Sequence, residues 1–336
     1  MEIASYLRPN PMQFFRRNLL HLAGAAAATL TFSRIAYAEG YPTKPVRLIV
    51  GFPPGGGTDV AARLIGQWLS ERLGQPVVID NRPGAGSTIA TEVAARADAD
   101  GYTLLLVSTA HAINATLYDR LNYDFARDIS PVAGFMRVPN VLVVNPSLPV
   151  KSLPEFMEFA RAHPAKINMA SGGNGTSQHL SGELFKMMTG LNITHVPYRG
   201  AAPALTDLIG GQVQVMFGDM PSTLEFIRAS KLRALAITTA TRLAALPDLP
   251  TVSEFVPNYE SSAWYGIGAP KNTPVKIVEK INRELTTAVG DPKMRERLVA
   301  LGGTPLEGTP SNFARLIAVE IAKWAEVVRF SGAKVE

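Results

Sequence analysis

The chain contains the same order of predicted elements twice, and this order restricts its fold more than any other feature. In each half, a β-rich run leads into a glycine-rich loop, a helical pattern, a second β-rich run, a second loop, another helical pattern and a third β-rich run. Strands that alternate with helices in this way favour parallel strands covered by helices. The halves share this order but no sequence repeat of fixed period. We therefore expect two similar α/β domains that face each other.

The β-rich runs are Val46–Gly51, Val77–Asp80 and Thr103–Val107 in the first half, and Ile167–Ser171, Asn192–Pro197 and Val213–Phe217 in the second. In the first half, Thr58 or Asp59 can cap a helix that Gly74 ends. In the second half, Ser152 begins a helix and Glu155 stands at the spacing of a capping box. Further helices are predicted over residues 88–96, 179–188 and 204–209.

Two β-rich segments, Val141–Val144 and Trp264–Ala269, have the character of crossings between the domains. Three helices are predicted after the second segment, over Pro274–Val289, Lys293–Leu301 and Pro310–Phe330. If the chain returns to the first domain at the second segment, two strands connect the domains and leave a cleft where small molecules commonly bind. We predict a two-lobed α/β fold with a two-strand hinge, in which residues 39–141 and 266–336 form lobe 1 and residues 142–265 form lobe 2. A linear chain of two domains is the alternative.

The first 38 residues have the order of an export signal. Arg16 and Arg17 precede an apolar run over residues 19–32, and Ala36–Ala38 forms a small-x-small cleavage site. The run is shorter than the ~20 residues that a transmembrane helix needs, although a short N-terminal anchor helix is the alternative. We predict a periplasmic protein whose signal peptide, residues 1–38, is removed. Both the twin-arginine and the general secretory route fit, and Met12 is a second possible start.

The basic charge of the chain belongs mainly to this leader. The whole chain has 33 Lys and Arg residues against 28 Asp and Glu, a net charge of +5. Residues 1–38 contain four arginines and one glutamate, which leaves +2 for the other 298 residues. No run of Lys or Arg remains there, so the sequence argues against nucleic-acid binding. The absence of cysteine excludes disulfides, thiol catalysis, Cys-ligated metals and a lipid-modified N-terminal cysteine.

The loop between the first predicted strand and its helix has the composition of an anion site. It contains Phe52 and then Gly55, Gly56, Gly57, Thr58 and Asp59. Three glycines let backbone N–H groups approach a ligand closely, and a helix start supplies unpaired donors with partial positive charge. A carboxylate or phosphate suits such a place. The Gly-Lys-Ser/Thr ending of a nucleotide P-loop is missing, and a tight strand-to-helix turn is the alternative.

The second half contains a counterpart of this loop in Ser171–His179, which includes Asn174. Ser171, Thr176 and Ser177 add hydroxyl donors to its glycines. If the two loops face each other across the cleft, one ligand can present an acidic group to each lobe. A dicarboxylate satisfies both loops.

Other polar residues stand where predicted strands end or in second loops. Arg82 and Arg199 can bind a carboxylate through two N–H groups, or lie solvated at the rim. Asp219 can bind an amine of the ligand or cap the next helix, and the cap is the favoured interpretation. Ser108 and Thr109 can donate to a ligand or form a turn.

The sequence lacks the patterns of an enzyme or a metal site. The four histidines after the leader have no metal-ligand spacing: His111, His163, His179 and His195. There is no G-x-S-x-G elbow, and no nucleophile, base and orienting group stand together. We expect a binding protein without cofactor or metal, with an exported enzyme acting on an organic acid as the less favoured alternative.

Several stretches together resemble the Bug family of periplasmic solute receptors, the binding components of tripartite tricarboxylate transporters. They run in family order across nearly the whole chain after the leader: Tyr41–Val50, Phe52–Asp59, Asp80–Gly86, Ser171–His179, Val196–Gly200, Leu232–Ala236, Leu246–Thr251 and Trp264–Gly266. Gly51 stands where family members often have proline.

This resemblance implies a type II periplasmic binding fold that closes on a carboxylate: a citrate-like acid, a dicarboxylate, an acidic amino acid or an aromatic acid. It implies that the carboxylate-binding loops are Gly55–Asp59 in lobe 1, and Ser171–His179 with Tyr198, Arg199, Gly200 and Ala201 in lobe 2. Phe52, Tyr198, Trp264 and Tyr265 can form the floor of an aromatic-acid pocket. The expected partner is a membrane permease, with a membrane signalling partner as the alternative, and the expected state is a monomer.

Overall fold

The computed structural model describes residues 40–243 and 246–333. The predicted export signal lies outside the described residues. Residues 40–43 belong to a separate N-terminal unit and contain no helix or strand, whereas the unit Lys44–Glu336 contains every element described below. Among the described residues, no helix combines the length and the apolar character that a membrane crossing requires.

The first predicted strand–helix series is confirmed. Strands β1 (Val46–Val50), β2 (Val77–Asn81) and β3 (Thr103–Ser108) form a parallel group with β1 in the middle. The helices α2 (Gly57–Leu73) and α3 (Thr88–Ala95) follow as predicted, with a 3-10 turn at Ala85–Ser87. Helix α4 (Thr109–Leu117), after β3, was not predicted. We call the part of the chain built on these strands the first lobe.

The N-terminus of α2 corrects one prediction. The capping residue is Gly56, not Thr58 or Asp59. The Asp59 carboxylate lies inside the first turn, where its Oδ2 accepts a hydrogen bond of 3.1 Å from the Gly55 backbone N–H. The predicted end of the helix is confirmed, since Gly74 adopts the left-handed conformation, with φ of 70°.

The second series is also confirmed. Strands β5 (Asn168–Ser171), β6 (Thr194–Pro197) and β7 (Val215–Asp219) are parallel. Their helices are α6 (Leu153–Ala162), α7 (Ser177–Thr189), α8 (Ala201–Ile209) and α9 (Met220–Arg228). The predicted cap of α6 is present, because the Ser152 hydroxyl accepts a hydrogen bond from the backbone N–H of Glu155. Strand β8 (Arg233–Ile237) was not predicted. We call this part the second lobe.

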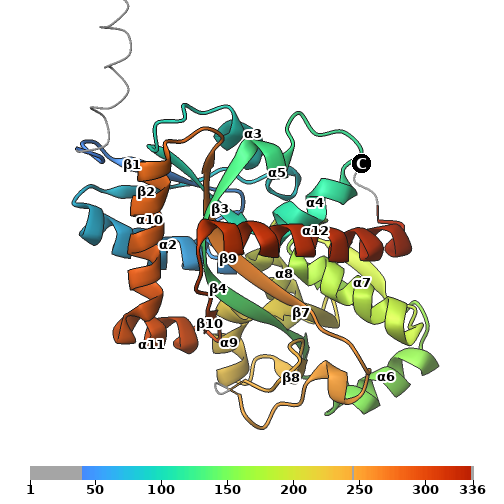
Figure 1. The fold of residues 1–336 in the computed structure, drawn as a ribbon. Coiled ribbons are helices and arrows are strands. Elements are labelled where there is room, and N and C mark those ends of the chain that lie inside the picture. The colour runs from blue at the N-terminus through green and yellow to red at the C-terminus, as the bar shows by residue number, and fades with distance from the viewer. Residues whose placement is uncertain (1–39, 244–245, 334–336) are drawn as a thin grey trace, which may run out of the picture. The chain divides into compact units, whose positions relative to one another are not determined.

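Two long antiparallel strands join the lobes. Strand β4 (Ile129–Val144) pairs with β9 (Ser262–Pro270) from Ile129 to Pro139. It then pairs with β7 from Asn140 onward and with β8 from Val141 onward. In Figure 1 these two strands run side by side between β3 and β7. The parallel pattern therefore does not extend through the whole sheet, because β9 is antiparallel to both β3 and β4. The two-strand hinge is thus present, and the exact lobe boundaries at 141/142 and 265/266 stay a prediction.

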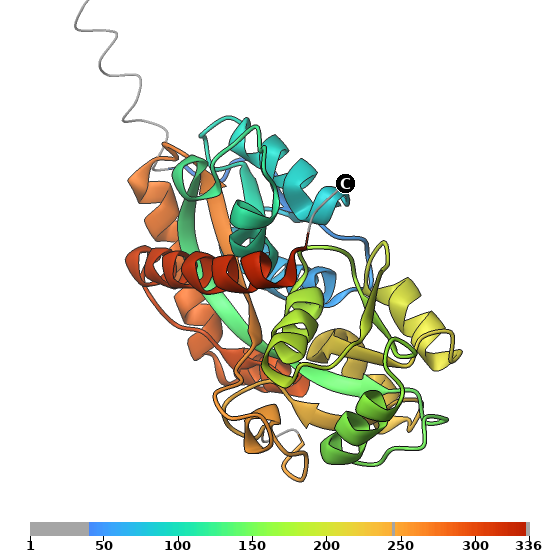
Figure 2. The same ribbon diagram turned by 90° about the vertical axis from the view of Figure 1, so that its right-hand side faces the viewer.

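The C-terminal part packs on these connecting strands. Helices α10 (Val275–Gly290), α11 (Pro292–Ala300) and α12 (Pro310–Ser331) lie where helices were predicted, and α5 (Phe125–Asp128) and the short β10 (Thr304–Pro305) were not predicted. Figures 1 and 2 show α12 lying across the molecule against β4. The buried carboxylate of Glu320 accepts hydrogen bonds from the indoles of Trp264 and Trp324, at 3.1 and 2.8 Å. This contact fixes α12 to β9.

Candidate functional site

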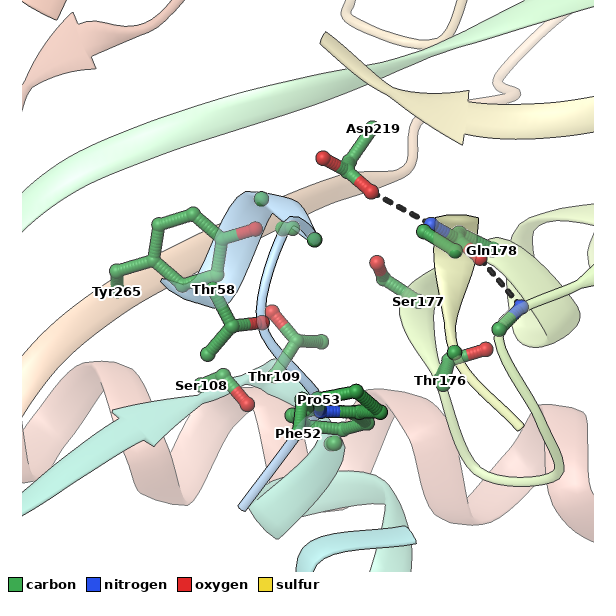
Figure 3. Close-up of a pocket in the computed structure, with 17 residues that line it drawn as sticks. Phe52, Pro53, Thr58, Ser108, Thr109, Thr176, Ser177, Gln178, Asp219 and Tyr265 are labelled. Atoms are coloured by element: carbon green, nitrogen blue, oxygen red, sulfur yellow. Dashed lines mark hydrogen bonds between the residues drawn. The ribbon is translucent and has the colours of Figure 1, made fainter. Parts of the chain in front are cut away.

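A cavity lies between the strand ends of the two lobes (Figure 3). Its volume is about 490 Å³ with the solvent at its mouth included. Its lining comes from both lobes and from β9: Phe52, Pro53, Gly56, Gly57, Thr58, Ser108, Thr109, Ala110, Gly172, Thr176, Ser177, Gln178, Gly200, Ala201, Asp219, Ala263 and Tyr265.

Five of the described helices begin at this cavity. The N-cap residues of α2, α4, α7, α8 and α9 all line it: Gly56, Ser108, Thr176, Gly200 and Asp219. Each helix start leaves backbone N–H groups unpaired and carries partial positive charge. No lysine or arginine is among the lining residues. Thr176 and Asp219 use part of this capacity, because their side chains cap α7 and α9. The remaining backbone N–H groups are of the kind that bind an anion.

The first-lobe wall depends on the close approach of a glycine. A Cβ atom at Gly57 would overlap the Asp219 carboxylate and lie 3.0 Å from the Tyr265 hydroxyl. Tyr265 shares a hydrogen bond with the Thr58 hydroxyl, and burial raises the pKa of Tyr265 well above its ordinary value. The phenol is therefore a neutral hydrogen-bonding group at neutral pH.

The second-lobe wall is held by the buried Gln178. Its Nε2 donates to Oδ2 of Asp219 at 2.5 Å, and its Oε1 accepts from the backbone N–H of Gly172 at 2.5 Å. Asp219 is also the cap that was predicted, since its Oδ1 accepts from the Ser222 N–H at 3.2 Å. Burial raises the pKa of the Asp219 carboxyl. Asp219 is the single acidic residue of the cavity lining, and both of its carboxylate oxygens accept hydrogen bonds from other groups of the protein.

Two hydroxyls of the second loop differ in what they do. Thr176 Oγ1 donates to the carbonyl of Gly173 at 2.8 Å and accepts from the N–H of His179 at 3.2 Å. Ser177, by contrast, makes no side-chain hydrogen bond with any described residue, and Figure 3 shows its hydroxyl directed into the cavity. Ser177 is therefore the hydroxyl of this loop that is available to a ligand.

Thr109 connects the cavity to the hinge. Its Oγ1 accepts a hydrogen bond of 3.0 Å from the backbone N–H of Trp264 on β9. Beside it, Ser108 and His111 form a capping box. Burial lowers the pKa of His111 to about 4, so this imidazole is neutral at neutral pH.

The structure brings most of the predicted site residues to one cavity. The lining includes Phe52, Gly56, Gly57, Thr58, Ser108, Thr109, Thr176, Ser177, Gly200, Ala201 and Asp219. Three predicted residues line a neighbouring cavity instead, namely Asn174, Tyr198 and Arg199.

Four predicted residues, Gly55, Asp59, Ser171 and His179, line neither cavity. Asp59 is buried and binds Gly55 and Arg63. The Ser171 hydroxyl lies 2.6 Å from Nε2 of His195, while His179 accepts from the Gly175 N–H and stacks on the His195 ring at 3.9 Å. The side chains of Asp59, Ser171 and His179 thus hold the two glycine loops in place.

Six lining residues were not in the predicted site: Pro53, Ala110, Gly172, Gln178, Ala263 and Tyr265. Gln178 lies inside the predicted second loop, so its polar side chain was the available signal. Tyr265 was considered as part of the floor, and the pairing of β9 with β3 places it opposite Ser108. Ala263 has no local feature that points to the site.

A family model described as "Tripartite tricarboxylate transporter family receptor" matches residues 61–332. The chain belongs to this family of receptors. Its match covers most of both lobes and both connecting strands. The resemblance seen in the sequence is thereby confirmed.

Relatives of this receptor are similar to it in sequence over nearly its whole length. Protein BugT of Bordetella pertussis is 41% identical over 95% of this chain and 98% of its own. The structure of R. palustris Rpa4515 with adipate is 41% identical, covers 87% of this chain and 98% of its own, and gives a TM-score of 0.85. The structure of the periplasmic binding protein BugD is 34% identical, covers 88% of this chain and all of its own, and gives a TM-score of 0.83. The structure of MatC of Rhodopseudomonas palustris with bound malate is also 34% identical, covers 86% of this chain and all of its own, and gives a TM-score of 0.81.

The fold of the receptor is therefore the two-lobed fold of periplasmic binding proteins, and its role is solute binding. Among residues 40–243 and 246–333, no three His, Cys, Asp or Glu side chains are grouped as a metal site requires.

Proposed function

We propose that this receptor captures a small dicarboxylate between its lobes in the periplasm and delivers it to a membrane permease. The observation that carries the proposal is the meeting of five helix N-termini, from both lobes, at a cavity without a basic side chain. Two relatives support the ligand class, one described with adipate and one with malate.

The energetics favour an anion at this place. Each helix N-terminus stabilises a nearby negative charge by about 0.3–1 kcal/mol, and by up to about 2 kcal/mol in a partly buried geometry. Hydrogen bonds from N–H groups to a carboxylate are stronger than those to a neutral acceptor. In our proposal, one carboxylate of the ligand binds at Gly57 and Thr58 and the other at Ser177 and Ala201.

The remaining predicted residues receive an indirect role in this proposal. Asp59, Ser171 and His179 keep the loops in the conformation that exposes their N–H groups. Asp219 orients Gln178 and can accept a hydrogen bond from a hydroxyl or ammonium group on the ligand. Such a contact would favour hydroxylated or amino dicarboxylates over plain ones.

Isothermal titration calorimetry against pairs of acids of equal length tests the proposal. Succinate and adipate are compared with butyrate and hexanoate, and a neutral sugar serves as a further control. We expect one site per chain, and at least tenfold tighter binding of a dicarboxylate than of its monocarboxylate. Equal affinity within each pair, or binding of the sugar alone, would contradict the proposal.

We also propose that the leader directs export by the twin-arginine or the general secretory route, and that the receptor acts as a monomer without turning over its ligand. N-terminal sequencing of the protein from a periplasmic extract should begin at Glu39. Light scattering should give the mass of one chain, and acid released from the protein should be recovered chemically unchanged. A bound acid converted to product by the purified protein would contradict the receptor proposal.

A further inference from the structure

Asn114 lies where the two lobes touch, outside the lining of the cavity. It belongs to α4 of the first lobe and is 1% exposed. Facing it is Gly175, a buried residue of the glycine loop of the second lobe. A Cβ atom at Gly175 would overlap the amide oxygen of Asn114, so this close approach requires a glycine. The Asn114 side chain and the Gly175 backbone are therefore in direct contact across the lobes.

A second contact brings the same parts of the two lobes together. Gly86, in the first lobe, has φ of 60°, and a Cβ atom there would be 3.1 Å from the backbone oxygen of Asn174 in the second lobe. Gly86 is also bound by Asn114, because Nδ2 of Asn114 donates to the Gly86 carbonyl at 2.6 Å. That hydrogen bond joins two residues of the first lobe, so it does not depend on the position of the second lobe.

The two ends of the Asn114 amide differ in their hydrogen bonds. Nδ2 has the Gly86 carbonyl, whereas Oδ1 is buried and accepts no hydrogen bond from the residues that the structure describes. The backbone N–H of Gly175 is not available to it, because this group donates to Nδ1 of His179 at 3.3 Å. Turning the amide around would bring its oxygen against the Gly86 carbonyl, so the oxygen must face Gly175.

The unpaired oxygen of Asn114 has one counterpart in the described part of the chain, Oδ1 of Asn140. The Asn140 amide nitrogen donates to Oγ of Ser181 at 2.7 Å, and its backbone N–H donates to Oγ1 of Thr238 at 2.9 Å. Both partners belong to the second lobe. Asn114 differs, because its unpaired oxygen faces the lobe to which it does not belong.

The position of the lobes therefore decides whether the Asn114 oxygen has a partner. In two-lobed binding proteins, the lobes move apart about the hinge strands and close around a ligand. When Gly175 moves away, water can donate to Oδ1, and when the lobes close, that hydrogen bond is lost. Burying an acceptor without a partner lowers the population of the closed form by a factor of about 5 to 150.

We propose that Asn114 sets the affinity of this receptor by disfavouring lobe closure. The protein without ligand is held open, and a bound dicarboxylate must supply the free energy that closes the lobes over Asn114. The affinity is then lower than the contacts in the cavity alone would give, and the bound acid is released faster. This inference deepens the proposed function, since it concerns how tightly the receptor holds its dicarboxylate.

Three variants separate this role from a structural one. Asn114→Ala removes both the unpaired oxygen and the bond to Gly86, whereas Asn114→Asp keeps the shape of the side chain and places a negative charge against Gly175. Asn282→Ala is the matched control, because its Nδ2 also donates to backbone carbonyls, at 2.9 and 3.2 Å, but lies on α10, away from the cavity.

Four measurements are made on these variants and on the wild type. Calorimetry with adipate and with malate gives the affinities, and stopped-flow displacement gives the rates of release. Urea denaturation gives the free energy of unfolding. Small-angle X-ray scattering without ligand gives the radius of gyration, which decreases as the lobes close.

Asn114→Ala should bind the acids about tenfold more tightly than the wild type and release them more slowly. Its free energy of unfolding should be no higher, because the bond to Gly86 is lost, so tighter binding cannot come from a more stable fold. Asn114→Asp should bind at least tenfold more weakly, since a carboxylate is costlier to bury than an amide. Without ligand, Asn114→Ala should have a smaller mean radius of gyration than Asn114→Asp. Asn282→Ala should lose stability and keep the wild-type affinity.

The outcomes keep the two proposals apart. If the wild type binds adipate or malate and Asn114→Ala binds it equally or more weakly, Asn114 does not disfavour closure, and the proposed function stands without this inference. If neither acid binds to the wild type, the proposed function fails and the radius of gyration alone decides the inference. Equal values for Asn114→Ala and Asn114→Asp would then overturn it.

Discussion

The amide of Gln178 and the carboxylate of Asp219 meet in the wall of the cavity, with Nε2 donating to Oδ2 at 2.5 Å (Figure 3). This bond joins the first turn of α7 to the end of β7, and the other end of the same amide holds Gly172 of the glycine loop. A buried carboxylate is costly unless hydrogen bonds satisfy it. Here the amide and the Ser222 N–H supply those bonds without a cation.

Replacing Asp219 by asparagine should disturb this wall. Gln178 and Ser222 both donate to Asp219, but asparagine has only one acceptor oxygen. Its NH₂ group must therefore face one of these two donors, and that hydrogen bond is lost. We expect the free energy of unfolding to fall by about 1–3 kcal/mol, measured by urea denaturation. The exposed Asp248→Asn is the control and should remain within about 0.5 kcal/mol of the wild type. Equal stability of Asp219→Asn and the wild type would argue against a structural role of the bond.

Gly57→Ala should reduce ligand binding by steric conflict. The added methyl group would overlap the Asp219 carboxylate and press on the Tyr265 hydroxyl. Overpacking of this kind costs about 1–3 kcal/mol, and at this position it also blocks the approach of a ligand to the start of α2. We expect at least tenfold weaker dicarboxylate binding by calorimetry.

Gly290→Ala is the matched control for that substitution. Gly290 ends α10, and a Cβ atom there meets nothing within 4 Å. Alanine at that position should leave affinity unchanged and the melting temperature equal or slightly raised. If Gly57→Ala binds as tightly as Gly290→Ala, the first loop is not the carboxylate site.

Ser177 and Thr176 should have separable roles. Ser177→Ala removes a hydroxyl with no described protein partner, so we expect affinity to fall by about tenfold at unchanged stability. Thr176→Ala removes the α7 cap and should lower the free energy of unfolding by about 1 kcal/mol. Calorimetry and urea denaturation on both variants distinguish these roles. A Ser177→Ala protein that is destabilised but binds normally would reverse the assignment.

The buried His111 and the half-buried His195 should make the receptor acid-sensitive. Burial lowers the pKa of His111 and of His195 to about 4, below the ordinary value of 6.5. Between about pH 4 and 6.5 the unfolded chain therefore binds more protons than the folded one. Stability is fully present above pH 6.5 and should fall as the pH decreases toward 4, by about 1–3 kcal/mol for each histidine.

Urea denaturation at pH 7, 5.5 and 4.5 measures this loss. In His111→Asn the side-chain oxygen can still accept a hydrogen bond from the Ser108 N–H, but the side chain does not titrate. Its stability should therefore decline less steeply than that of the wild type. Parallel profiles would show that His111 is not responsible for part of the acid sensitivity.

Much of the local structure could be predicted because its causes lie within a few residues. The cap at Ser152, the left-handed Gly74 and the helices α10 to α12 depend on neighbouring positions, and the structure confirms them. The cap of α2 was predicted wrongly at Thr58 or Asp59. Both residues have side chains that commonly cap helices. The Asp59 carboxylate instead accepts hydrogen bonds from the Gly55 N–H and from the side chain of Asn81, which lies on β2.

The sequence by itself determined the α/β series, the two glycine loops at strand ends and the near-neutral charge of residues 39–336. Each of these depends on local spacing or on composition. Only the tertiary structure decided which groups face one another. The antiparallel pairing of β9 with β3 places Tyr265 opposite Ser108 and beside Thr58. The packing of α7 on β7 brings Gln178 to Asp219. These contacts join residues far apart in the chain, so their free energy comes from long-range packing that no local pattern records.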